Sequence, residues 1–274
     1  MKQPINRIVV PLDTASETRT AIATAARLAA RWRVPLHGIF IEDEELICLA
    51  GLPFACQVTL TTGVEPLTKE HVEDHFQAFA ERARREFAAA AERYGVRWSF
   101  EVVRGPIAAV VSDADRHDFV VAGAANRPIS GHFGVASRWW SSVATVRRPF
   151  LLARREWEAG GSVLALLHGR GPEAARALDL ASQIADCCGG SLTVAGPSDI
   201  IDETDFAAWV AQSVDEQSLT VRTVSATDEP SRLQERIVEL DCRLVVIEAG
   251  AEETPLDELR HGLEQLACDV LIIR

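Results

Sequence analysis

An internal repeat constrains this chain more than any other feature of its sequence. Residues 161–196 read GSVLALLHGRGPEAARALDLASQIADCCGGSLTVAG, and they match residues 6–41 element for element at a separation of about 155 residues. The ends match too, since DCRLVVIEAGAEE parallels HDFVVAGAANR and ACDVLIIR parallels RRPFLLAR. A tandem duplication explains this more simply than one sheet of ten strands.

Each repeat has the pattern of an α/β unit. Short runs of Val, Ile and Leu alternate with longer alanine-rich segments of helical period, which is typical of a parallel sheet covered by helices. In the first repeat we expect strands at 7–12, 36–41, 97–103, 119–122 and 150–153, and helices at 17–32, 68–94, 106–115 and 137–146. The predicted fold class is therefore α/β, with two tandem five-stranded, Rossmann-like domains and helices on both faces.

The boundary between the two domains is expected in the charged, glycine-containing stretch REWEAGG, residues 155–161. This gives domains at 1–156 and 157–274. The first repeat also carries an extra segment, 43–66, which the second shortens. Its apolar part, LICLAGLPF at 46–54, can be a lid over a site, an oligomer contact or a cover for the sheet edge, and the last is favoured.

Composition excludes several classes of partner. A formal net charge of −12 and a pI of about 5.1 argue against nucleic acid or an anionic membrane surface. No apolar run approaches the roughly 20 residues of a membrane helix, and the N-terminus shows no signal-peptide pattern, so a cytoplasmic location is expected. The six cysteines contain no C-x-x-C pair and are expected to be reduced and mostly structural.

The candidate site lies where a parallel sheet of this kind binds ligands, beyond the carboxyl ends of its strands. Asp13 follows the first strand, and Gly123 ends the fourth. Glycine allows a phosphate to approach the backbone, and Ser137 heads a predicted helix whose N–H groups favour an anion. A carboxylate such as Asp13 can accept hydrogen bonds from a ribose or an adenine amino group, so the pattern favours a nucleotide site.

These residues resemble the universal stress protein family in its tandem form. Nucleotide-binding members carry an aspartate after the first strand, which Asp13 matches, and a loop G-x2-G-x9-G-[ST] after the fourth. Gly123 and Ser137 match the first and last loop positions, whereas Asn126 and Ala136 replace the other two glycines. Asn is the residue besides glycine that best tolerates positive φ, so an altered site can survive.

The resemblance implies an adenine nucleotide alpha hydrolase-like fold, a role in stress response or signalling, and ATP or AMP as ligand in some members. The residues predicted to bind nucleotide are Pro11, Asp13, Ile41, Gly123, Asn126, Arg127 and Ser137. Two alternatives stay open: a protein-interaction module that has lost nucleotide binding, and a slow ATPase in which Asp13 is the only evident carboxylate. A protein partner or a homo-oligomer is also possible.

The second repeat departs further from the nucleotide-binding pattern. His168 stands where the first repeat has Asp13, and Gly250 is matched to Gly123. The acidic residues that follow would face a phosphate with like charge, so we expect no nucleotide there and a structural role as partner of the first domain. They are Glu252, Glu253 and Asp257.

The remaining signals favour simple structural interpretations. His71 and His75 lie one helical turn apart without an evident third ligand, so a solvated helix face is favoured over a metal site. Trp139 and Trp140 are expected to pack rather than to stack on a ligand. No phosphate-binding G-x4-G-K-[ST], nucleophile elbow or zinc motif occurs, so no catalytic residue is assigned and an enzyme is the less favoured reading.

Overall fold

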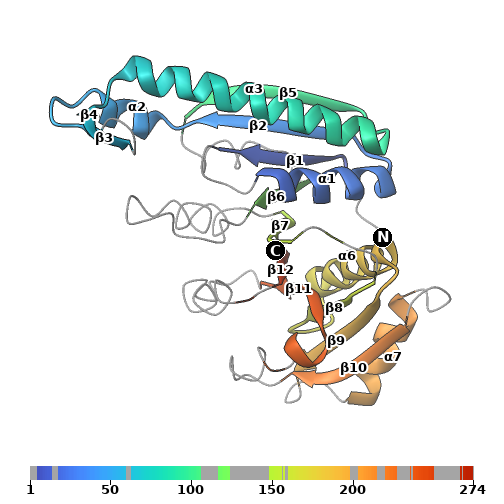
Figure 1. Ribbon diagram of the computed structural model, residues 1–274. Coiled ribbons are helices and arrows are strands. Elements are labelled where there is room, and N and C mark those ends of the chain that lie inside the picture. Colours follow the sequence, from blue (N-terminus) through green and yellow to red (C-terminus); the bar gives the residue numbers. More distant parts are fainter. Residues whose placement is uncertain are drawn as a thin grey trace.

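The chain folds around one ten-stranded sheet (Figure 1). This is a computed structural model, and it describes residues 5–13, 18–59, 63–105, 117–123, 148–155, 157, 160–197, 203–214, 220–226, 235, 237–249, 266 and 268–273. The predicted helices at 106–115 and 137–146 lie outside these residues, as do Asn126, Arg127, Ser137, Trp139 and Trp140.

The sheet consists of two five-stranded parallel halves with the same strand order. The N-terminal half is ordered β5-β2-β1-β6-β7, and the C-terminal half is ordered β10-β9-β8-β11-β12. The strands of the first are β1 (Arg7–Leu12), β2 (Leu36–Glu42), β5 (Trp98–Arg104), β6 (Asp118–Gly123) and β7 (Phe150–Ala153). Those of the second are β8 (Ser162–Leu166), β9 (Ser191–Pro197), β10 (Thr220–Ala226), β11 (Cys242–Glu248) and β12 (Asp269–Ile273). The predicted α/β fold class is confirmed.

The two halves are joined by their last strands. β7 pairs antiparallel with β12, with Leu151 opposite Leu271 at the centre of the pairing. Both strands are buried along their length. In an isolated half, β7 or β12 would be an unpaired edge strand, and the pairing between the halves removes both of these edges. The two sequence repeats therefore correspond to the two five-stranded halves, and the pairing of their last strands, which the sequence did not predict, joins them into one ten-stranded sheet.

A buried carboxylate holds the chain where it leaves this seam. Asp269 begins β12, and its Oδ1 accepts hydrogen bonds from the backbone N–H groups of Arg154 at 2.7 Å and Arg155 at 3.2 Å. Its Oδ2 accepts a hydrogen bond from the indole Nε1 of Trp157. Burial raises the pKa of Asp269, and these three donors oppose that rise by stabilising the charged form.

The helices begin and end where local chemistry specifies. α3 (Lys69–Tyr94) starts after Thr68, whose Oγ1 accepts from the His71 N–H at 3.3 Å, and it ends at Gly95 with φ of 66°. α6 (Pro172–Cys188) starts with proline and ends at Gly189 with φ of 63°. With α1 (Thr18–Trp32) and α7 (Glu203–Ser213), they confirm the alanine-rich segments as helices.

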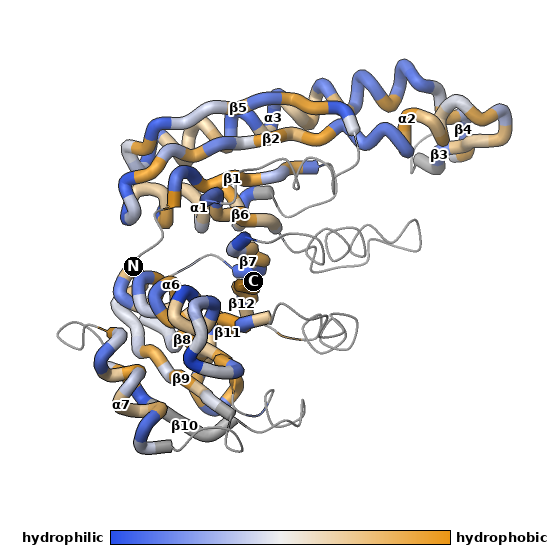
Figure 2. Tube along the Cα trace, turned by 180° about the vertical axis from the view of Figure 1, so that it is seen from behind, coloured by the Kyte–Doolittle hydropathy of each residue, from blue (hydrophilic) through white to orange (hydrophobic). Residues whose placement is uncertain are grey.

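Two apolar clusters lie on opposite faces of the sheet. The larger includes buried side chains of α1, α3 and α6 packed against alternate strand residues, among them Ile8, Phe40 and Leu244. The smaller contains the strand residues that point the other way, such as Val9, Ile41 and Val245. Figure 2 shows the hydrophobic strands running through the interior of both halves.

The extra segment of the first half lies beyond the carboxyl end of β2 (Figure 1). It forms α2 (Glu44–Ala50) and a hairpin of β3 (Cys56–Thr59) and β4 (Gly63–Pro66). α2 packs against α3, with Ile47 and Ala50 buried. The segment thus packs on α3 and adds no strand to the large sheet, in which β5 is the last strand.

Among the described helices, none is both long enough and apolar enough to cross a membrane. The six cysteines all lie within the described residues and are free thiols, of which Cys48 and Cys56 are exposed. Burial raises the pKa of Cys188 to about 11 and that of Cys242 to about 12. These two thiols are therefore poor nucleophiles, as expected for structural cysteines.

Candidate functional site

The strand order places the candidate crevice between β1 and β6. In each half the chain proceeds outward from the first strand to one side and then returns to the other side for the fourth strand. The strand order reverses between these two strands, and ligands of open α/β sheets bind beyond their carboxyl ends at this point. Asp13 directly follows β1 and Gly123 is the last residue of β6, so the fold brings both sequence-predicted residues to this edge.

β1 and β6 are fastened at their amino ends. The Nε of Arg7 lies 3.1 Å from each carboxylate oxygen of Asp118, and the Asp118 side chain is 1 % exposed. The pairing runs from Arg7 opposite Asp118 to Val9 opposite Val120 and ends there. The two strands are thus tied at the edge away from the candidate site, and their backbone ladder stops before the edge where the site lies.

Pro11 accounts for the early end of this ladder. The N–H of Ile8 donates to the carbonyl of Pro35 on the β2 side at 3.0 Å, and N–H directions alternate along a strand. The backbone nitrogen of residue 11 therefore faces β6, and proline has no hydrogen to donate from it. Pro11, one of the residues predicted to bind nucleotide, therefore accounts for the early end of the ladder between β1 and β6.

The C-terminal half has no such interruption. There the Leu167 N–H donates to Ala195 on the β9 side at 2.9 Å, so the N–H of Leu166, which corresponds to Pro11, faces β11. The ladder between β8 and β11 accordingly continues to Leu166 opposite Ile247. The two halves therefore share a topology but differ at the place where a ligand would enter.

The other predicted site residues have different surroundings. Asp13 is 9 % exposed, and Gly123 is buried and pairs with Ala153 of β7. Ile41 is 1 % exposed and packs in the smaller apolar cluster with Val9 and Val120, so it forms part of the floor beneath this edge. The predicted phosphate-contacting residues Asn126, Arg127 and Ser137 lie outside the described residues.

An ion-pair cluster anchors the neighbouring segment. The Nε of Arg104, at the end of β5, donates to Glu42 Oε2 at 3.0 Å, and its Nη2 donates to Glu73 Oε1 of α3 at 3.2 Å. These carboxylates raise the pKa of the Arg104 guanidinium. The cluster links the carboxyl ends of β2 and β5 to α3, and because its one cation faces two carboxylates it does not form an anion site.

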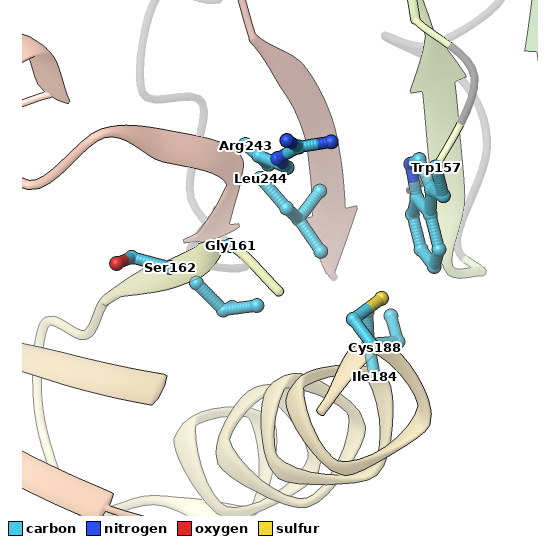
Figure 3. Close-up of a pocket in the computed structure, with 8 residues that line it drawn as sticks. Trp157, Gly161, Ser162, Ile184, Cys188, Arg243 and Leu244 are labelled. Atoms are coloured by element: carbon cyan, nitrogen blue, oxygen red, sulfur yellow. The ribbon is translucent and has the colours of Figure 1, made fainter. Parts of the chain in front are cut away.

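Neither the paired histidines nor a hollow at the junction offers a second site. His71 and His75 are exposed on α3, and the described residues contain no group of three His, Cys, Asp or Glu side chains placed to hold a metal. The hollow in Figure 3 is bordered by Trp157, Cys188 and Leu244 and is almost wholly apolar. It lies at the amino ends of β8 and β11, beside Trp157 beyond the carboxyl end of β7, and no residue of β1 or β6 lines it.

A residue that the sequence analysis missed lies at the equivalent place in the C-terminal half. Glu248, the last residue of β11, is 7 % exposed, and its Oε2 accepts a hydrogen bond from the backbone N–H of His168 at 2.8 Å. Matching the two sheets strand by strand aligns Glu248 with Gly123, and the match of Gly250 to Gly123 is corrected. A count outward from the Val-Val pair in each fourth strand would have revealed this.

Solved structures share this architecture over the whole chain. A universal stress protein from Archaeoglobus fulgidus DSM 4304 matches with a TM-score of 0.69 at 13% identity, covering 100% of this chain and 97% of that one. The chain has the fold of the universal stress proteins. A protein of unknown function from Pseudomonas aeruginosa PAO1 matches with a TM-score of 0.57 at 16% identity, covering 99% of this chain and 93% of that one. The sequence itself matches no family model and no curated protein.

Proposed function

We propose that this chain is a tandem universal stress protein that binds one adenine nucleotide, ATP or AMP, at the N-terminal crevice. The observation that carries the proposal is the interruption of the β1–β6 ladder at Pro11, beside Asp13 and Gly123. It combines three properties that a nucleotide site of this fold needs, namely an opening, a carboxylate and a strand end without a side chain.

Asp13 would recognise the nucleoside. Its side chain is nine-tenths buried, so a hydrogen bond from a ribose hydroxyl or an adenine amino group would form with little competition from water. A buried carboxylate would repel a phosphate, which favours the nucleoside at Asp13 and the phosphates farther along the edge. By the resemblance to universal stress proteins, Asn126, Arg127 and Ser137 would contact the phosphates.

Gly123 would allow the phosphates to approach the end of β6. It has no side chain at the position where the C-terminal half carries a carboxylate, so neither bulk nor like charge obstructs an anion. We further propose that binding orders the adjacent surface and changes what a partner protein recognises in a stress response, in the cytoplasm. The domains 1–156 and 157–274 would then act as a ligand-binding unit and its structural partner.

The test is to identify what the purified protein carries. The protein is denatured, and the released adenine nucleotides are separated by chromatography and quantified per chain. We expect a stoichiometric fraction of ATP or AMP from the wild type and little from Asp13→Asn. Glu65→Gln, in the exposed hairpin, is the matched control and should retain the wild-type amount. If the wild type carries none and binds none on addition, the proposal is wrong.

A second candidate function is protein interaction without nucleotide. The observation that favours it is the exposure of apolar side chains on the extra segment, where Leu52 is 41 %, Phe54 74 % and Val64 69 % exposed. Hydrophobic positions of this segment are visible around α2 and the β3–β4 hairpin in Figure 2. A slow ATPase is the third candidate, and it requires phosphate release that Asp13→Ala abolishes.

A further inference from the structure

The two halves differ in what occupies the carboxyl end of their central strands. In the N-terminal half Val9 pairs with Val120, and in the C-terminal half Leu164 pairs with Val245. Four residues after the first member of each pair lie Asp13 and His168. Three residues after the second member lie Gly123 and Glu248, so a residue without a side chain corresponds to a glutamate.

The glutamate side chain bridges the two strands. Glu248 Oε2 lies 2.8 Å from the backbone nitrogen of His168. His168 is two residues beyond Leu166, which forms the last pair of the β8–β11 ladder. By alternation from Leu166, this N–H faces β11, so the side chain takes over where the backbone ladder ends. Glu248 is 7 % exposed although His168 itself is exposed, so the carboxyl group lies under the mouth of the crevice and not in open solvent.

A carboxylate at this position has the chemistry of a ligand. Strand-end N–H groups at a switch point are donors that an open α/β sheet offers to a bound anion. Here the acceptor belongs to the protein itself. A second anion at the same place would meet a nearby like charge in a poorly hydrated site, and it would find the His168 N–H already used.

We propose that Glu248 is an internal occupant of the C-terminal crevice, which closes the gap between β8 and β11 and reserves ligand binding for the N-terminal half. Glu248 is thus a specificity-determining residue, because it decides which of the two halves of the chain can accept a ligand. The closure of the C-terminal crevice rests on a contact within that half and is independent of the N-terminal half, whereas the reservation of ligand binding for the N-terminal half rests on the proposed function.

The test is amide hydrogen exchange at His168 in the full chain. Glu248→Gln keeps the length of the side chain and an acceptor oxygen, whereas Glu248→Leu keeps the volume and removes the acceptor. Glu239→Ala removes an exposed glutamate of the same half and is the matched control. The amide of Leu164, inside the β8 ladder, reports any general opening of the sheet. Should Glu248→Leu fail to fold, Glu248→Met removes the acceptor with a more adaptable side chain.

We expect the His168 amide to exchange at least about tenfold faster in Glu248→Leu than in the wild type, with Leu164 unchanged. Glu248→Gln should stay within about threefold of the wild type, as should Glu239→Ala. An unchanged His168 rate in Glu248→Leu would overturn the proposal. So would equally fast exchange in Glu248→Gln and Glu248→Leu, because the side-chain oxygen would then not be the acceptor that protects the amide.

Discussion

At the scale of single residues, the two halves differ at Pro11 and Gly123. Pro11 has no backbone hydrogen to donate, whereas the corresponding Leu166 has one, and Gly123 has no side chain where the other half carries Glu248. The sequence supplied Asp13 and Gly123 as candidates from their places at strand ends. It did not supply the reason for Pro11, because the side of the strand that a backbone nitrogen faces depends on the pairing with both neighbours.

Close packing at Gly38 provides a test of the N-terminal core. A β-carbon on this residue would lie 2.7 Å from a ring carbon of Phe100 and 2.9 Å from one of Phe87, and the two rings already pack edge to face. Gly38→Ala should therefore lower the free energy of unfolding by about 1–3 kcal/mol in urea titrations. Gly169→Ala is the control, because its nearest neighbour would be 4.0 Å away, and a similar loss there would refute the packing argument.

At the scale of elements, most boundaries were predictable and the connections between elements were not. The predicted strand at 7–12 and the helix at 17–32 agree with β1 and α1 to within a residue, since alternating and 3.6-residue patterns are local. The hairpin at Cys56–Pro66 was missed because each of its strands has only four residues and the β4 sequence GVEP has no apolar alternation. Glu248 was missed because glutamate in a strand end suggests solvent rather than a buried contact.

The early end of the β1–β6 ladder, after Val9, is directly testable. Pro11→Leu introduces the residue type of the corresponding Leu166 and supplies an N–H that faces β6. We expect this new amide to be protected from hydrogen exchange, as the ladder extends to residue 122, and we expect nucleotide affinity to fall as the crevice narrows. The free energy of unfolding should change by no more than about 1 kcal/mol, because the added hydrogen bond offsets the greater freedom of the unfolded chain. Rapid exchange of the amide at residue 11 would contradict the explanation.

The contact between Trp157 and Asp269 joins the linker to β12 and predicts a dependence on pH. Trp157→Phe removes a donor to a buried carboxylate and should destabilise the protein by about 1–3 kcal/mol near pH 7. The indole stabilises the charged form, so the pKa of Asp269 rises further in the variant. The loss should therefore be largest above this pKa and shrink as the pH falls through it and the carboxyl group becomes protonated. Urea titrations over a pH series from pH 7 downward measure the difference, and a loss that stays constant down to the pH of acid unfolding would contradict the assignment.

At the scale of the whole molecule, duplication has produced one continuous sheet with unequal halves. The sequence revealed the duplication, but the antiparallel pairing of β7 with β12 could not be read from it, because both strands have the composition of any buried strand. α1 and α6 contact each other across the same junction, and Arg31 forms an ion pair with Asp186 there. The C-terminal half thus completes the sheet that the N-terminal half begins.

This arrangement predicts the behaviour of an isolated half. A fragment of residues 1–156 would expose the edge of β7, a buried strand whose partner has been removed. We expect the fragment to dimerise through this edge or to precipitate, which light scattering detects at micromolar concentration. A stable monomer with the helical content of its share of the intact chain would show that the seam is not needed to cover β7.

The most direct test of the central claim is calorimetric titration of the nucleotide-stripped protein with ATP and with AMP. We expect saturable binding at one site per chain, lost in Gly123→Val, in which a side chain obstructs the strand end, and retained in Gly169→Ala. Binding should also raise the midpoint of thermal unfolding in proportion to ligand occupancy. Two equivalent sites per chain would contradict the inequality of the halves, and the absence of both heat and thermal stabilisation at millimolar nucleotide would contradict nucleotide binding itself.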